Sequence, residues 1–171
     1  MEIVVSDTNI LIDLYNSGLL YYCKQLDLDF RTLDLIIEEI EVPEQRATIN
    51  EIIKNGSLKV CSLTGSQVAD VYQKIRYYNG KCNLSPEDIS VMVYAINNHC
   101  RLLTGDKTLR KKAILENITV SGILYLTDML IRESVLEPTC MIRSLKLLLE
   151  SNSRLPKKLI EERIANLSLK L

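Results

Sequence analysis

The sequence predicts a three-layer α/β/α fold, in which a central parallel sheet lies between helices, with extra helices at the C-terminal end. Short apolar runs alternate with segments of helical periodicity along most of the chain, which is typical of parallel α/β proteins. The first run, Ile3 to Val5, is apolar and β-branched, as expected of a central strand buried on both faces. The last third has no strand-like run.

Capping and turn residues mark the predicted helices in the N-terminal half. Pro43 suits the first turn of a helix. Thr64 and Gln67 match a capping box and open a longer helix. Leu33 to Ile37 is a second short apolar run, which we predict to be a strand. The expected order is strand 3–6, helices 10–15 and 19–26, strand 33–37, helix 43–54, strand 58–63 and helix 64–78.

The C-terminal half begins with a strong helix signal. Ser85 is a suitable cap, Pro86 a suitable first helical residue, and Asp88 the acid three residues after the cap. The helix carries an apolar stripe and runs to about His99. A strand at 101–104, a helix at 107–116, a strand at 118–120 and helices from 122 onward, broken at 137–138 and 155–156, complete the prediction. We expect residues 1–135 to form the α/β domain and residues 136–171 a helical extension packed on the same unit.

Composition narrows the class of protein. The 171 residues suit one domain, and a net charge of −1 predicts no general affinity for nucleic acid or membranes. The cysteines are odd in number and contain no Cys-x-x-Cys pair, which argues against a disulfide framework or a zinc site. No basic leader is present, and no stretch reaches the ~20 apolar residues of a membrane span. We therefore expect a cytoplasmic protein.

Acidic residues stand at the ends of predicted strands or the starts of predicted helices. Asp7 follows the first strand, and Asp106 follows the strand at 101–104. Glu38 and Glu39 follow the run at 33–37, and Asp88 lies in the first turn of its helix. The carboxyl ends of parallel strands and the starts of the following helices share one edge of a sheet, where ligands bind. These acids can therefore meet there.

A cluster of carboxylates needs compensation, because like charges raise one another's pKa unless a cation lies nearby. Oxygen ligands suit a hard divalent ion such as Mg²⁺ or Mn²⁺. An ion of this kind can lower the pKa of a bound water and stabilise charge on a phosphodiester. The pattern suggests metal-dependent phosphoryl chemistry.

Each acid also has a structural interpretation. Asp88 could serve only as the third helical residue of the Ser85 cap, and Asp106 could be a plain turn or cap residue. One of Glu38 and Glu39 is expected to be solvated. Asp7 is hardest to explain in this way, because an acid directly after a buried strand needs a partner. The joint occurrence of four such acids favours a functional site.

The order of these motifs resembles the PIN-domain family, which includes the VapC-like toxin ribonucleases. The motifs are Val-Val-Ser-Asp7-Thr-Asn9, Ile-Ile-Glu-Glu39-Ile, Leu-Ser-Pro-Glu-Asp88-Ile-Ser and Leu-Leu-Thr104-Gly-Asp106, and the resemblance runs from Ile3 to about Leu130. The family's spacing favours Glu39 over Glu38 and Asp88 over Glu87. By resemblance, Asp7, Glu39, Asp88 and Asp106 would be the catalytic, metal-binding acids, with Ser6, Asn9 and Thr104 as supporting polar residues.

The resemblance implies an endoribonuclease that depends on Mg²⁺ or Mn²⁺ and hydrolyses RNA phosphodiester bonds. Residues 1–135 would then be the nuclease domain. A toxin of this kind would be neutralised by an antitoxin protein and would often form a homodimer. The helical tail is longer than in a minimal toxin.

Basic residues beside Asp106 are candidates for contact with RNA phosphates. Lys107, Arg110 and Lys111 lie on the helix that follows this acid, although a solvated basic face is an equally good interpretation. Arg154, Lys157 and Lys158 form a second basic cluster. The single histidine, His99, ends a helix and is expected to be structural or exposed.

Other classes of protein fit less well. A haloacid-dehalogenase-type phosphatase would need an acid two residues after Asp7, where this chain has Asn9. A phospho-acceptor receiver domain would need an acidic pair and a mid-chain acceptor aspartate, and no such pattern is present. The non-enzymatic alternative is a PIN-like protein that binds nucleic acid or a partner and whose acids hold a metal weakly or not at all.

Overall fold

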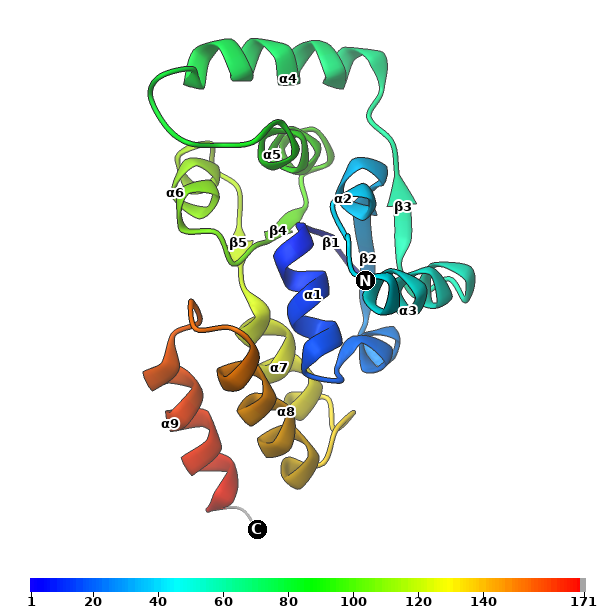
Figure 1. The fold of residues 1–171 in the computed structure, drawn as a ribbon, viewed down its shortest axis with the longest axis vertical. Coiled ribbons are helices and arrows are strands. Elements are labelled where there is room, and N and C mark those ends of the chain that lie inside the picture. The colour runs from blue at the N-terminus through cyan, green and yellow to red at the C-terminus, as the bar shows by residue number, and fades with distance from the viewer. Residues whose placement is uncertain (170–171) are drawn as a thin grey trace.

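A parallel sheet forms the centre of the molecule. The computed structural model describes residues 1–169, and within them the sheet has five strands in the order β3-β2-β1-β4-β5. All neighbouring strands are parallel (Figure 1). The strands are β1 (Glu2–Ser6), β2 (Leu28–Leu33), β3 (Lys59–Cys61), β4 (Arg101–Leu103) and β5 (Val120–Ser121). The central position of β1 confirms the prediction made from its apolar run.

Helices cover both faces of this sheet. They are α1 (Thr8–Asn16), the 3₁₀ helix η1 (Leu20–Gln25), α2 (Asp34–Glu38), α3 (Pro43–Lys54), α4 (Gly65–Tyr78), α5 (Pro86–Asn98), α6 (Lys107–Leu115), α7 (Ile123–Arg132), α8 (Pro138–Ser151) and α9 (Lys157–Ser168). Helix α5 packs on β1 and β4, with α4 outside it and α6 beside it. Helix α1 packs against α3, α7 and α8 on the other side (Figure 1). The three-layer α/β/α prediction is confirmed.

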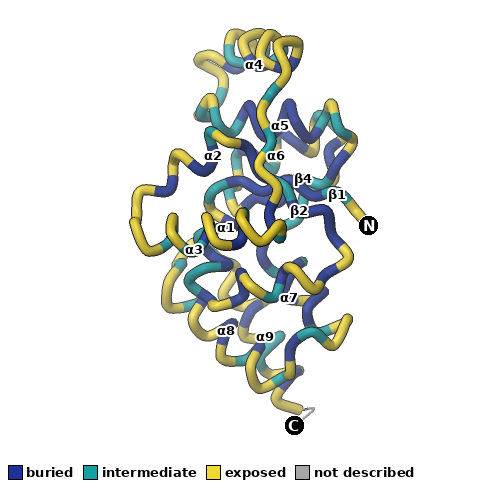
Figure 2. The backbone as a smooth tube through the Cα atoms, turned by 90° about the vertical axis from the view of Figure 1, so that its right-hand side faces the viewer, coloured by how far each residue is buried: buried dark blue, intermediate teal, exposed yellow. Residues whose placement is uncertain are grey.

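Strand register brings distant residues together at the carboxyl edge of the sheet. Ser6 pairs with Leu103 across β1 and β4, and the Asp7 N–H donates to the Leu103 carbonyl at 3.0 Å. Asp7 and Thr104 therefore leave neighbouring strands side by side. Burial holds this arrangement in place, since Val4, Val5, Leu102 and Leu103 are completely buried (Figure 2 shows the buried centre).

The predicted strand at 33–37 was wrong. The strand is β2, at Leu28–Leu33, and the apolar run belongs to the short helix α2. Asp29 and Arg31 interrupt the apolar pattern of β2 in the sequence, and in the folded protein they form an ion pair. Asp29 is buried and paired with Arg31 and with Lys59, at 2.5 and 2.8 Å.

Smaller differences concern the ends of elements. The helix predicted at 19–26 is the 3₁₀ helix η1, the strand at 58–63 is only Lys59–Cys61, and the strand at 118–120 lies at Val120–Ser121. Both predicted capping boxes are present, one from Thr64 to Gln67 and one from Ser85 to Asp88. No helix in the described part of the chain is long and apolar enough to cross a membrane.

The C-terminal helices pack on the rest of the chain through buried apolar side chains. Met141, Leu145 and Leu148 of α8 are buried, as are Ile160 and Leu167 of α9. Helix α8 contacts α1 and α7, and α9 contacts α8. The last two positions of the predicted extension, 170–171, lie outside the described residues.

Candidate active site

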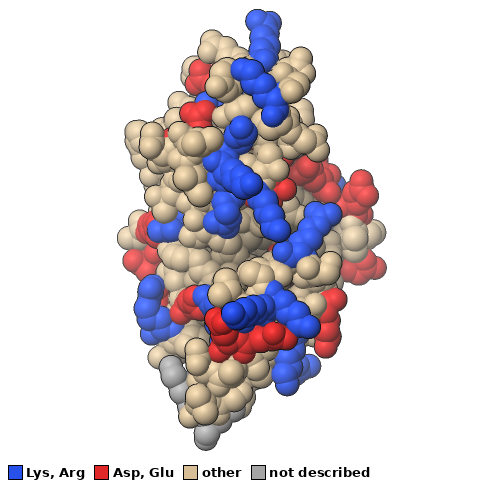
Figure 3. All heavy atoms as spheres, turned by 90° about the vertical axis from the view of Figure 1, so that its left-hand side faces the viewer, with Lys and Arg blue, Asp and Glu red and all other residues tan. Residues whose placement is uncertain are grey.

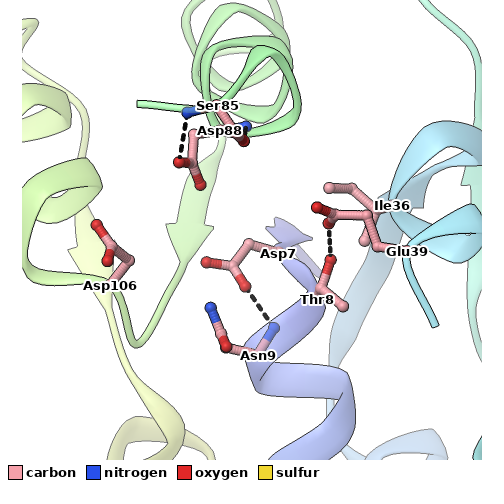
Figure 4. Close-up of a pocket in the computed structure, with 8 residues that line it drawn as sticks. All are labelled: Asp7, Thr8, Asn9, Ile36, Glu39, Ser85, Asp88 and Asp106. Carbon is pink, nitrogen blue, oxygen red and sulfur yellow. Dashed lines mark hydrogen bonds between the residues drawn. The ribbon is translucent and has the colours of Figure 1, made fainter. Parts of the chain in front are cut away.

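Four acidic side chains from separate parts of the chain line one pocket at the carboxyl edge of the sheet. The pocket has a volume of about 290 Å³. Its lining residues are Asp7, Thr8, Asn9, Ile36, Glu39, Ser85, Asp88 and Asp106 (Figure 4). Glu38 and Glu87, the two alternatives that the sequence left open, are absent from this lining. The structure thus brings together the four acids that the motif order selected.

Asp7 lies at the centre of the site and is held by two donors. Its side chain is 3% exposed and caps α1, with Oδ1 accepting the Asn9 N–H at 2.6 Å. The Thr104 hydroxyl donates to Oδ2. Burial raises the pKa of the Asp7 carboxyl from 3.8 to about 6, against the lowering effect of these hydrogen bonds. The charge of Asp88 adds to the rise, which indicates that the two carboxylates interact.

Asp88 serves both as a cap and as a pocket residue. Its backbone N–H donates to the Ser85 hydroxyl, and its Oδ2 accepts the Ser85 N–H, both at 3.0 Å. Burial raises the pKa of the Asp88 carboxyl, and the charges of Asp106 and Glu87 raise it further. Asp88 therefore has the capping role that its sequence position indicated. Its carboxylate also faces the pocket (Figure 4).

Asp106 and Glu39 approach the pocket from either side. Asp106 caps α6, and its Oδ1 accepts the Leu109 N–H at 2.7 Å. Glu39 is the C-cap residue that follows α2, and it accepts a hydrogen bond from the Thr8 hydroxyl. In the described part of the chain, Asp88, Asp106 and Glu39 each keep one carboxylate oxygen without a hydrogen-bond donor. These oxygens are available to a ligand.

The supporting residues predicted from the sequence connect the acids to one another. The buried Thr104 hydroxyl donates to Asp7 and accepts the Asp106 N–H at 3.0 Å, so it bridges two of the acids. The Ser6 hydroxyl donates to the Asp7 carbonyl at 2.8 Å. The Asn9 side chain lines the pocket (Figure 4). Thr8, which lines the pocket and donates to Glu39, was not predicted as a site residue, although its position next to Asp7 could have indicated it.

The donor set fits a hard divalent cation in its chemistry, and the spacing of the donors limits how such an ion could be held. None of the described residues that line the pocket is a lysine or an arginine, so the carboxylates have no protein cation among them. However, no group of three or more His, Cys, Asp or Glu side chains within residues 1–169 is close enough to hold a metal ion by itself. An ion that keeps several of its waters, as Mg²⁺ does, fits this wider arrangement.

The three basic residues predicted to contact RNA phosphates have different surroundings. Lys107 and Lys111 are exposed at the start and middle of α6. Arg110 is half-buried, and its guanidinium donates to the Thr104 carbonyl at 2.9 Å and to the Val120 carbonyl at 3.4 Å. These bonds hold β4, β5 and α6 together, which leaves phosphate contact as a proposal for Lys107 and Lys111. His99 is the C-cap residue of α5 and lies at the opposite end of this helix from Asp88.

Comparison with known proteins agrees with this architecture. A family model described as PIN domain matches residues 3–168 of the chain. The crystal structure of VapBC2 from Rickettsia felis bound to a DNA fragment from their promoter is similar, at 15% sequence identity and a TM-score of 0.50. The similarity covers 70% of this chain and 98% of that chain, and it concerns the fold. No curated protein matches the sequence.

Proposed function

The chain belongs to the PIN-domain family, and on this premise we propose that it is a metal-dependent endoribonuclease that hydrolyses RNA phosphodiester bonds. One observation supports the proposal above the others. Asp7, Glu39, Asp88 and Asp106 come from four separate segments and line one pocket that contains no lysine or arginine among its described lining residues. Carboxylates gathered in this way are costly unless a cation or a reaction uses them.

These four acids are the residues that would hold a divalent ion, Mg²⁺ or Mn²⁺. When bound, such an ion supplies positive charge that polarises a phosphoryl oxygen and lowers the pKa of water. The chain's own residues fix the acids in place. Thr104 and the Asn9 N–H hold the Asp7 carboxylate in one orientation, and the Ser85 cap does the same for Asp88.

Phosphate positioning is the proposed role of residues at the start of α6. Lys107 is exposed at this start and Lys111 is exposed in the middle of the helix, and both are close in sequence to Asp106, which caps α6. A helix N-terminus with nearby cations favours the binding of phosphate groups. The Asn9 amide, which lines the pocket, can donate to a phosphate oxygen.

The alternative function is that of a PIN-like binding protein with little or no catalysis. It is favoured by the absence of a closely spaced three-ligand group within the described residues. The toxin role, an antitoxin partner and a homodimer are further proposals that follow from the family. A small antitoxin-like reading frame next to this one would support the first two of them.

Cleavage of a mixed pool of RNA separates the two functions. With Mn²⁺ or Mg²⁺ we expect the pool to shorten with time, and with excess chelator we expect no cleavage above the buffer control. The chelator removes the ion that would polarise the phosphoryl group, so activity should return when Mn²⁺ is added back. An equal rate in chelator would reject metal dependence, and no cleavage under any of these conditions would favour the binding protein.

A further inference from the structure

A second, larger groove opens beside the acidic pocket. It has a volume of about 960 Å³ and shares Asn9 and Asp106 with the pocket, so the two spaces lie side by side. One wall comes from the start of α6 and the segment that enters α7. The opposite wall comes from α9 and from the turn between α8 and α9, residues 152–156. A polymer that is cut at the acids extends beyond the pocket, and this groove adjoins the pocket.

Two cations face this groove without an ion-pair partner among the described residues, one on each wall. Lys107 belongs to α6, and Arg154 belongs to the turn before α9, and both are exposed. The other two cations in the lining already have partners within the protein. Arg163 forms a two-point ion pair with Asp128, and Arg110 donates to backbone carbonyls. Figure 3 shows Lys and Arg side chains following one another down this face from α4 toward its middle.

The groove also has an apolar surface. Leu124, Leu155, Pro156 and Leu159 line it, and Leu159 is 45% exposed although it is apolar. Cations on opposite walls with apolar side chains between them suit a ligand that carries both phosphates and flat, weakly polar rings. A nucleotide strand has this composition.

The turn that carries Arg154 is held against α1, the helix that Asp7 caps. The Asn152 side chain donates to Oδ1 of Asp13 at 2.9 Å, and its own Oδ1 accepts the Arg154 N–H at 3.0 Å. Asp13 is buried in α1, the helix that Asp7 caps. The backbone of Arg154 is therefore held at a set position relative to the acids, across 139 residues of sequence from Asp13 to Asn152.

We propose that the α8–α9 turn forms one side of a groove for single-stranded RNA, in which Arg154 and Lys107 bind phosphates next to the one that is cut. The proposal rests on the proposed function for its direction, because it takes the acidic pocket as the point of cleavage. It assigns the C-terminal helices a part in substrate binding in addition to packing.

The test measures binding of a labelled, mixed-sequence single-stranded RNA of about 12 nucleotides by fluorescence anisotropy. Chelator is present throughout, so that cleavage plays no part, and salt is varied between about 0.05 and 0.3 M. Each phosphate contact contributes about 0.7 to the slope of log affinity against log salt for a single strand. We expect Arg154→Ala and Lys107→Ala each to reduce the slope by about that amount and to weaken binding about fivefold at about 0.1 M salt.

Matched variants make the result specific. Arg154→Lys keeps the charge and should retain most of the affinity, whereas Lys146→Ala removes an exposed cation of α8 that does not line the groove and should leave affinity and slope unchanged. If Arg154→Ala behaves like Lys146→Ala, the proposal is wrong, and a peptide becomes the better candidate for the groove. If the protein binds RNA through Arg154 but cuts nothing with Mn²⁺, the groove stands and the nuclease function fails.

Discussion

Replacing Asp7 with asparagine is expected to lower the rate of RNA cleavage by about a thousandfold or more. The substitution keeps the shape of the side chain and a good helix cap, since asparagine caps helices as well as aspartate does. What it removes is the central negative charge of the pocket, against which a divalent ion would be bound. Initial rates of cleavage with saturating Mn²⁺ measure the effect.

A nearby acid outside the pocket provides the control. Glu38→Gln removes a negative charge next to Glu39 but not from the lining of the pocket, and it should leave the rate within about twofold, because screened surface charges interact weakly. Cleavage by Asp7→Asn at a rate close to that of the unmodified protein would show that the acids do not form the site.

The same substitution is expected to make the folded protein more stable when no metal is present. The pKa of Asp7 rises from 3.8 to about 6 on folding, and this difference of about 2 corresponds to about 3 kcal/mol. The folded state therefore binds the proton more tightly, so stability falls as pH rises from about 4 to about 6 and stays low above that. Asparagine cannot ionise and avoids this cost.

Some of the gain is lost because asparagine cannot accept both hydrogen bonds that reach Asp7. We expect a net gain of about 2 kcal/mol at pH above about 7, or a rise in melting temperature of about 4–8 °C for a chain of this size. The gain should disappear below about pH 3, where the carboxyl is neutral in both states. Thermal unfolding of both proteins in chelator, at several pH values, measures it. If the variant is less stable at every pH, the carboxylate is needed for folding. A loss of activity in that variant would then be no evidence for a catalytic role of Asp7.

Local sequence signals predicted the central strand and three of the four acids in the right structural context. β1 is identifiable because it is short, apolar and buried on both faces, and Asp7 is conspicuous because it follows at once. The helix that carries Asp88 is announced by Ser85 and Pro86, whose capping chemistry is local. These features depend on neighbours in sequence, which is why the sequence alone reveals them.

Features that depend on distant contacts could not be predicted. Glu39 was expected directly after a strand but is the C-cap residue of the short helix α2, because Asp29 and Arg31 interrupt the apolar pattern of β2. The groove beside the acids depends on how α8 and α9 pack, and therefore on the contact between Asp13 and Asn152. Nothing near Arg154 in the sequence indicates that it lines the same groove as Asp106.

A calorimetric titration with Mn²⁺ tests most directly whether these acids form a single cation site. Two pairs of adjacent residues give the comparison, since Glu39 and Asp88 line the pocket and Glu38 and Glu87 do not. We expect saturable binding to the unmodified protein, a loss of affinity of at least about tenfold in Glu39→Gln and Asp88→Asn, and little change in Glu38→Gln and Glu87→Gln. Equal affinities across all four variants, or no saturable binding to the unmodified protein, would contradict the proposed site.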